Sequence, residues 1–123
     1  MGSHERTVDE KNRVSIPVSL MNGNKDFVVA IHGDHLDLFR LSEWTGIQEK
    51  RLSAETSESD EIKRWLGTAY SVTADQQNRI RLNDSCAAIL SKKKAKSAIL
   101  VGLFDHVEIW PPQKWRKFLR AQS

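Results

Sequence analysis

The sequence predicts an α+β fold in which two copies of one structural unit pack against each other. Residues 9–16 match residues 75–82 at an offset of 66, with Asp, Asn and Arg identical in both segments. A second match follows in the same order at an offset of 71, between residues 27–39 and 98–110. Two ordered matches indicate an internal repeat. Each copy, at about 50 residues, is too small to bury a core alone, so we expect the copies to share one core.

The repeat divides the 123 residues into three parts of one compact domain. We assign residues 5–52 to the first repeat, residues 53–68 to a polar connection and a helix, and residues 69–120 to the second repeat. The change of offset places an insertion at residues 91–97. We give residues 1–4 no role.

Each copy begins with a turn between two strands. Residues 69–73 can form the first strand of the second copy, whereas the residues before Asp9 show little pattern. The Asp-x-x-Asn-Arg segment predicts a turn, because Asp caps its own turn and Asn tolerates a left-handed backbone. Residues 14–16 and 80–82 alternate apolar and polar side chains, as half-buried strands do.

A short helix follows in each copy. Pro17 has the backbone φ that suits a first helical position, and this helix ends by residues 22–24. Asn83 is the N-cap that we predict for a helix over residues 84–90. Cys86 lies on the apolar side of that helix, where a free cysteine usually behaves as a small hydrophobic residue.

A hairpin comes next in each copy. The predicted strand pairs are residues 27–31 with 36–40, and residues 99–103 with 107–110. The connecting residues contain Gly and Asp, which form turns. His35 and His106 occupy equal positions in the two hairpins, and we interpret both as turn residues.

Three further helices carry apolar stripes. The first begins at Ser42, which we expect to cap it, and carries Trp44, Ile47 and Leu52. The second follows the polar connection and carries Ile62, Trp65 and Leu66. The third opens with Pro111 and Pro112 and carries Trp115, Phe118 and Leu119. Trp110 ends the second hairpin. We expect the four tryptophans in the core or in a subunit interface rather than stacked on bases.

Composition excludes several classes of protein. The longest apolar run, residues 98–104, falls well short of the roughly 18 residues of a membrane span. Cys86 is the only cysteine, which excludes an internal disulfide and a thiolate metal cluster and favours a cytoplasmic location. Residues 1–85 hold 11 Lys/Arg and 14 Asp/Glu, and residues 86–123 hold 8 and 2. A basic last third permits contact with a polyanion.

No constellation for catalysis emerges from the sequence. It has no phosphate-binding glycine loop, no nucleophile with an evident His partner and no paired carboxylates in a recognisable frame. His32 and His35 have the spacing of a metal-binding pair, but no cysteine and no second pair accompany them. We therefore expect no enzymatic activity, no metal, no cofactor and no small-molecule substrate.

The repeated turns and hairpins resemble those of the MraZ family, which belongs to the AbrB-like, swapped-hairpin superfamily of bacterial regulators. The family motif, Asp-x-Lys-Gly-Arg and then apolar-x-Ile-Pro, is similar to residues 9–17 and, in the second copy, to residues 75–82. Residues 101–102, 108–110 and Trp115 resemble the second hairpin and final helix of the family. The resemblance covers residues 6–120.

The chain departs from the family motif at three points. Asn12 and Asn78 replace the glycine of each turn, and Gln77 replaces the basic residue of the second turn. The lead-in that usually precedes the first motif is mostly absent. An asparagine can hold the same turn, but it adds a side chain beside any ligand.

The resemblance implies a double-split β-barrel of two interleaved repeats with flanking helices. It also implies a homo-oligomeric ring that binds double-stranded DNA at repeated operator boxes, associated with the nucleoid and placed before genes of division and cell-wall synthesis. Arg13 and Arg79 would be the chief DNA contacts, with Lys11 and Arg81 beside them. Asp9, Asn12, Asp75 and Asn78 would orient the two turns.

The side-chain chemistry suits that role, although other interpretations stay open. Arginine presents a fork that grips phosphate or the edge of guanine. Arg13 and Arg79 could instead pair with Asp9 and Asp75 and only staple the turns. Residues 92–96 could be a nucleic-acid patch or an ordinary solvated run. The whole protein could be an oligomeric protein-binding scaffold that has lost DNA affinity, or an AbrB-type antitoxin.

Overall fold

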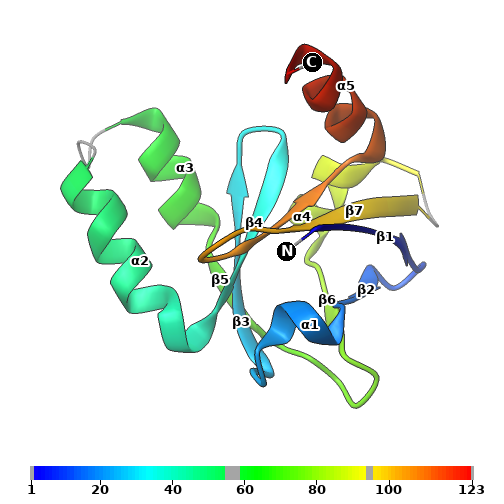
Figure 1. Cartoon of the computed structure of the whole chain (residues 1–123), viewed down its shortest axis with the longest axis horizontal. Helices are drawn as coiled ribbons and strands as arrows, with labels where there is room; N and C mark the ends of the chain where they lie inside the picture. The colour runs from blue at the N-terminus through cyan, green and yellow to red at the C-terminus, as the bar shows by residue number, and fades with distance from the viewer. Residues whose placement is uncertain (1, 55–58, 94–95, 123) are drawn as a thin grey trace.

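The computed structural model describes residues 2–54, 59–93 and 96–122, without the side chains of Leu52 and Ala54. The strands are β1 (Gly2–Val8), β2 (Arg13–Ser15), β3 (Asp26–His32), β4 (His35–Arg40), β5 (Tyr70–Thr73), β6 (Arg79–Arg81), β7 (Lys96–Gly102) and β8 (Val107–Trp110). The helices are α1 (Val18–Met21), α2 (Leu41–Ala54), α3 (Asp60–Thr68), α4 (Asp84–Leu90) and α5 (Pro112–Gln122) (Figure 1). No helix in these ranges is long and apolar enough to cross a membrane.

The strands form one eight-stranded antiparallel sheet that curls into a nearly closed barrel. Its order is β5-β3-β4-β8-β7-β1-β2-β6. The two copies interleave, because β1 of the first pairs with β7 of the second and β5 of the second pairs with β3 of the first. The predicted α+β barrel of two interleaved repeats is therefore confirmed. The domain boundaries at residues 52–53 and 68–69 stay a prediction.

An internal two-fold axis relates the copies. Asp37 of β4 lies opposite Glu108 of β8, and these two residues are mates at the offset of 71. Val14 of β2 lies opposite Ile80 of β6, its mate at the offset of 66. At a two-fold axis, a residue of one copy contacts the equivalent residue of the other copy. Polar residues at such positions are therefore brought together in pairs.

Two apolar clusters cover the two faces of the first hairpin. The barrel interior holds Val14, Ile80 and Leu100, all fully buried. On the opposite face of β3 and β4, α2 and α3 pack Phe39 and Trp65 into a second cluster. Burial of each such side chain contributes about 1.5–3 kcal/mol. Figure 1 shows α2 and α3 side by side at one edge of the molecule, away from β2 and β6.

Helix capping agrees with the sequence in the second copy and differs in the first. Asn83 Oδ1 accepts the Cys86 backbone N–H at 2.9 Å, as predicted for an N-cap. Pro17 precedes α1 in an extended conformation instead of occupying its first turn. The prediction that Ser42 caps α2 is wrong: α2 begins at Leu41, and the Ser42 hydroxyl donates to Asn24 Oδ1 at 2.9 Å. Strand β4 continues directly into α2, which leaves no capping position.

Two further predictions need correction. Residues 2–8 have a role, because β1 forms seven residue pairs with β7. His35 is not a turn residue, since it begins β4, whereas His106 lies in the turn between β7 and β8 as predicted; both side chains are buried. Part of the polar connection, residues 55–58, lies outside the described residues. Burial raises the pKa of Cys86 to about 11, which fits a structural thiol.

Candidate nucleic-acid interface

The first Asp-x-x-Asn-Arg turn is closed by its own backbone and by Asp9. The Asp9 N–H donates to the Arg13 carbonyl at 3.0 Å, and the Asn12 N–H donates to the Asp9 carbonyl at 2.9 Å. Asp9 Oδ1 accepts the backbone N–H groups of Lys11 at 2.9 Å and Arg13 at 2.8 Å. Asn12 has a φ of 61°, a left-handed conformation that asparagine adopts more readily than most residues.

The second turn repeats this geometry. Asp75 Oδ1 accepts the backbone N–H groups of Gln77 at 2.8 Å and Arg79 at 2.9 Å, and Asn78 has a φ of 62°. The backbone N–H of Arg13 lowers the pKa of Asp9, and that of Arg79 lowers the pKa of Asp75, in each case as the leading cause. Both carboxylates are therefore charged at neutral pH.

Each aspartate holds its arginine by one edge only. Asp9 Oδ2 binds Arg13 Nε at 2.7 Å, and Asp75 Oδ2 binds Arg79 Nε at 3.0 Å. Within the described part of the chain, no hydrogen bond or ion pair engages the Nη atoms of either arginine. The two side chains are 33% and 30% exposed. The pairing with aspartate therefore positions each guanidinium and leaves its two-pronged end for a ligand.

The short β2–β6 ribbon gathers the arginines on one face. Arg13 pairs with Arg81, and Arg79 pairs with Ser15, while Val14 and Ile80 between them are fully buried. Since side chains alternate along a strand, the three arginines share the outer face. Like charges directly opposite in a sheet are destabilising. Asp9 and Asp75 offset this repulsion at Arg13 and Arg79, and the ribbon presents three guanidinium groups on one face.

Lys11 and the two asparagines complete the set of residues predicted for this site. Lys11 is exposed in the first turn, whereas the second turn has no cation at Gln77. Asn12 Nδ2 donates to Asp84 Oδ1 at 3.3 Å, and Lys25 Nζ donates to Asn78 Oδ1. Each asparagine thus bonds to a residue of the other repeat. Both bonds lie at the surface and tie each added side chain to the neighbouring repeat.

A basic groove of about 950 Å³ lies where α4 and β7 meet α5. Six basic residues are among those that line it: Lys93, Lys96, Lys114, Arg116, Lys117 and Arg120. Lys96 Nζ donates to the carbonyls of Ala87 and Ser91 at the end of α4, so it has a structural role. Of the basic stretch singled out in the sequence, Lys94 and Ala95 lie outside the described residues.

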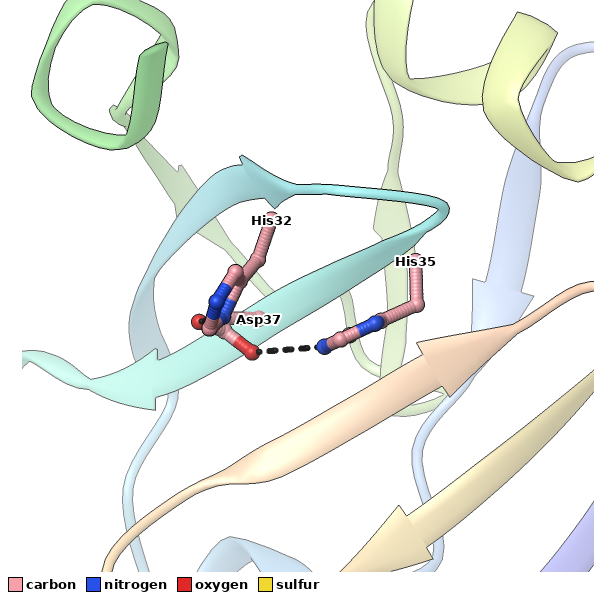
Figure 2. A group of neighbouring side chains, drawn as sticks. All are labelled: His32, His35 and Asp37. Atoms are coloured by element: carbon pink, nitrogen blue, oxygen red, sulfur yellow. Dashed lines mark hydrogen bonds and ion pairs between the residues drawn. The ribbon is translucent and has the colours of Figure 1, made fainter. Parts of the chain in front are cut away.

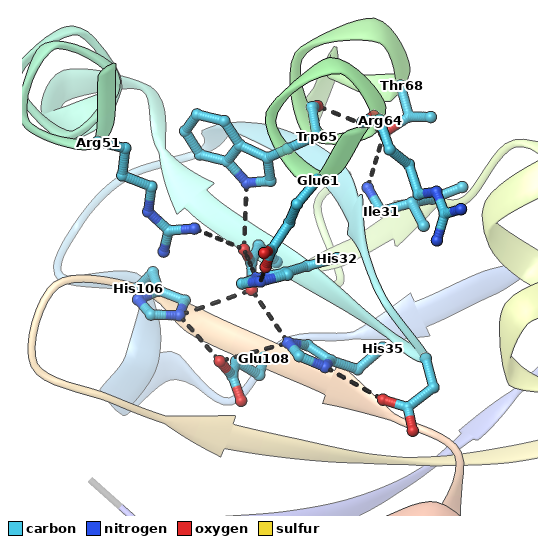
Figure 3. A network of polar contacts seen from close by, with 12 residues as sticks. Ile31, His32, His35, Arg51, Glu61, Arg64, Trp65, Thr68, His106 and Glu108 are labelled. Carbon is cyan, nitrogen blue, oxygen red and sulfur yellow. Dashed lines mark hydrogen bonds and ion pairs between the residues drawn. The ribbon is translucent and has the colours of Figure 1, made fainter. Parts of the chain in front are cut away.

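The structure also contains a buried polar cluster that the sequence did not predict. Asp37, fully buried, accepts Trp65 Nε1 at 3.1 Å and Arg51 Nη1 at 3.3 Å on Oδ2. His32 Nδ1 lies 2.9 Å from the same oxygen, and His35 lies beside it (Figures 2 and 3). The repeat offset could have revealed this cluster, because it equates Asp37 with Glu108 and His35 with His106.

Opposite charges govern the pKa values in this cluster. Burial alone would raise the pKa of Asp37, but the neighbouring His32 and His35 hold it well below its usual range. Burial alone would lower the pKa of His35, but Asp37 and Glu108 raise it to about 9. The pKa of His106 is raised against the effect of burial by Glu108 and Asp105. Two groups have metal-ligand character: His32, His35 and Asp37; and Asp37, His106 and Glu108.

The chain was compared with known proteins. The model of the MraZ family, described as "MraZ protein, putative antitoxin-like", matches it twice, over residues 1–65 and 65–123. The chain belongs to the MraZ family. A transcriptional regulator MraZ of Desulforapulum autotrophicum is 32% identical over 115 residues, which cover 89% of this chain and 77% of that protein. Another from Roseiflexus sp. is 30% identical over 128 positions, covering the whole chain and 88% of that protein.

The MraZ resemblance inferred from the two turns is thereby confirmed. A third relative, the transcriptional regulator MraZ of Caldanaerobacter subterraneus, is 28% identical, covering 98% of this chain and 87% of its own length. MraZ proteins are transcriptional regulators and not enzymes, which confirms the prediction that this chain is not an enzyme. In the MraZ fold of this chain, the two motif turns flank the β2–β6 ribbon.

Proposed function

We propose that the chain is a DNA-binding transcriptional regulator that uses the outer face of the β2–β6 ribbon to contact double-stranded DNA. The observation that carries the proposal is the pair of guanidinium groups held at Nε by Asp9 and Asp75 with their Nη atoms unengaged in the described residues. Such a fork can grip a phosphate or the O6 and N7 atoms of guanine. Arg81 and Lys11 add positive charge beside it.

The proposal includes a homo-oligomer, and the surface of the chain supports this part. Phe118 and Leu119 on α5 are 42% and 48% exposed, and Phe104 at the tip of the second hairpin is 95% exposed. Large apolar side chains exposed at a surface favour association. In a ring, several weakly binding turns would engage repeated operator boxes and gain affinity by avidity. We place this regulator in the cytoplasm at the nucleoid, acting before genes of division and cell-wall synthesis.

The test compares duplexes and variants by fluorescence anisotropy. A labelled duplex with tandem repeats of a candidate box and a scrambled duplex would be titrated with wild type and with the Arg13→Ala/Arg79→Ala variant. The control is Lys63→Ala/Arg64→Ala, which removes two exposed cations from α3 on the far side of the molecule (Figure 1). Both variants lose two positive charges, so a loss of affinity seen only in the turn variant reports a local contact and not the net charge of the protein.

Tighter binding to the tandem repeats, lost in the turn variant and kept in the control, would support the proposal. Equal binding of all three proteins to both duplexes would overturn it. The scaffold alternative predicts that wild type forms an oligomer without measurable DNA binding. Two features favour it, the asparagine side chain in each turn and the missing basic residue at Gln77. Asn12 and Asn78 are bonded to residues of the other repeat, which weakens the first of these grounds.

A further inference from the structure

The internal two-fold axis brings two carboxylates face to face inside the protein. Asp37 and Glu108 are directly opposed in the β4–β8 pair. The Asp37 side chain is fully buried, and that of Glu108 is 16% exposed. Like charges opposed on paired strands destabilise a sheet, and a buried charge needs a partner. Arg51 and His32 supply positive charge at Asp37 Oδ2, which leaves Asp37 Oδ1 and the Glu108 carboxylate to be compensated.

Two histidines, one from each repeat, complete a ring of four polar atoms around this axis. His35 Nε2 lies 3.4 Å from Asp37 Oδ1 and 3.4 Å from Glu108 Oε2. His106 Nε2 lies 3.6 Å from Asp37 Oδ1 and 3.1 Å from Glu108 Oε2. In a tetrahedral zinc site with bonds of about 2.0–2.2 Å, neighbouring ligand atoms are about 3.3–3.6 Å apart. These four separations, of the six in such a site, are close to that range, and the ligand atoms of Asp37, His106 and Glu108 all lie within 4.8 Å of one another.

The other polar atom of each carboxylate is already held by an indole. Trp65 Nε1 donates to Asp37 Oδ2 at 3.1 Å, and Trp110 Nε1 donates to Glu108 Oε1 at 2.9 Å. One oxygen of each carboxylate is therefore fixed by the protein, and the other faces the ring. Figure 3 shows the side chains converging from β4 and β8 beneath α3.

Each histidine has a carboxylate on its outer side, and one of the two is hydrogen-bonded. His106 Nδ1 lies 2.7 Å from Asp105 Oδ1, whereas His35 Nδ1 lies 3.6 Å from Asp34 Oδ1 and makes no hydrogen bond within the described residues. A carboxylate at Nδ1 with Nε2 facing inward is the usual support of a metal-binding histidine. The segments 34–37 and 105–108 both read Asp-His-x-acid, so each repeat supplies half of the same arrangement.

Orphaned atoms point into the ring. Among the described residues, Asp37 Oδ1 and both ring nitrogens of His35 are buried and make no hydrogen bond. Asp37 is completely inaccessible to solvent, so water does not serve these atoms from outside. Buried polar atoms in native proteins normally have a partner. A central cation would satisfy Asp37 Oδ1 and His35 Nε2 together.

We propose that His35, Asp37, His106 and Glu108 bind one Zn²⁺ ion on the internal two-fold axis. Two imidazoles with two carboxylates suit zinc, whereas Mg²⁺ and Ca²⁺ take six or more oxygen ligands. The ion links β4 of the first repeat to β8 of the second. This inference does not depend on the DNA-binding proposal, and it departs from the sequence-based expectation of no metal.

The experiment uses zinc-stripped, full-length protein. Co²⁺ would be titrated as a spectroscopic probe, and Zn²⁺ and Mg²⁺ would be titrated by calorimetry. We expect one Co²⁺ per chain with the intense visible bands of tetrahedral coordination, and displacement by Zn²⁺ but not by Mg²⁺. Zinc at about 100 times its Kd should raise the folding equilibrium constant about 100-fold, seen as a higher Tm.

Variants distinguish zinc binding at this site from zinc binding at the other histidines of the chain. Glu108→Gln and His106→Gln should each weaken Zn²⁺ binding at least about 10-fold, as losses around metal sites do. His32→Gln is the matched control inside the cluster, since the polar contacts of His32 go to Asp37 Oδ2 and Glu61 and its ring only packs against that of His35, with the ring centroids 5.0 Å apart. His4→Gln is the control outside it. Both controls should bind Zn²⁺ within a few-fold of wild type.

X-ray absorption on zinc-loaded wild type keeps the test decisive if a variant fails to fold. Two imidazole nitrogens and two oxygens around zinc would support the proposal. Three outcomes would overturn it: no Co²⁺ or Zn²⁺ binding to wild type, a coordination shell without two imidazoles, or a loss of binding in His32→Gln that His106→Gln does not share. The last result would assign the ion to the triad of His32, His35 and Asp37 in Figure 2.

Discussion

Replacing Arg13 and Arg79 by glutamine should flatten the salt dependence of DNA binding by a defined amount. Each turn presents one guanidinium whose Nη atoms are unengaged within the described residues, so one protomer offers two phosphate contacts. The slope of log K against log salt is about −0.9 per contact, so the double variant should lose about 1.8 units of slope. Over the range from 1 M to 0.15 M salt, a slope change of about 1.8 corresponds to about a 30-fold loss of affinity at 0.15 M.

The assay is anisotropy with a short duplex that carries a single box, so that one protomer engages it. Binding constants would be measured between about 0.05 and 0.3 M salt, where such slopes are steep. The matched control is Lys63→Gln/Arg64→Gln, which removes two exposed charges from α3. We expect the control to keep the wild-type slope.

An unchanged slope in the Arg13→Gln/Arg79→Gln variant would refute the reasoning. So would an equal change in the Lys63→Gln/Arg64→Gln control, because it would reduce both effects to net charge. If the slope falls as expected but affinity for the box falls much more than 30-fold, the excess measures contacts to bases, worth about 1–3 kcal/mol each.

Three further predictions concern stability and assembly. Asn12→Ala should lower the free energy of unfolding by about 1–2 kcal/mol, because alanine is strained at a φ of 61°. Asn12→Gly should retain most of the wild-type stability. Thermal unfolding of the two variants measures this difference, and an equal loss of stability in both variants would contradict the prediction. Trp65→Phe should cost about 1.5–3 kcal/mol in urea unfolding, because it removes a hydrogen bond to the buried Asp37 carboxylate; a change below about 0.5 kcal/mol would count against that contact. On the proposal of a homo-oligomer that uses α5, Phe118→Asp should lower the particle mass in light scattering with an unchanged circular dichroism spectrum, since this side chain is 42% exposed. A wild-type particle mass would exclude α5 from the proposed interface.

The turns were predictable because their stabilising bonds are local. Asp9 bonds to Lys11 and Arg13, and Asp75 repeats the pattern, so each turn is closed by contacts within five residues. Residue types at this spacing carry the information directly. The Asn83 N-cap was predictable for the same reason, since its partner is three residues away.

Strand β1 was not predictable from its own residues. Gly2–Val8 is mostly polar, and only Val8 is buried in the core. Its conformation comes from pairing with β7, about 95 residues away, along seven positions. Backbone hydrogen bonds do not depend on side-chain pattern, so a polar segment becomes a strand when a partner edge is available.

The duplication, the two turns and the residues that the turns present are all predictable from the amino-acid sequence. These features depend on short-range hydrogen bonds and on apolar periodicity, which are written in consecutive residues. Only the tertiary structure decided that Arg13 faces Arg81, that the asparagine side chains bond across the repeats, and that Asp37 meets Glu108 between two histidines. Those contacts join residues about 70 positions apart. Their geometry is fixed by the register of β2 with β6 and of β4 with β8, which no local pattern specifies.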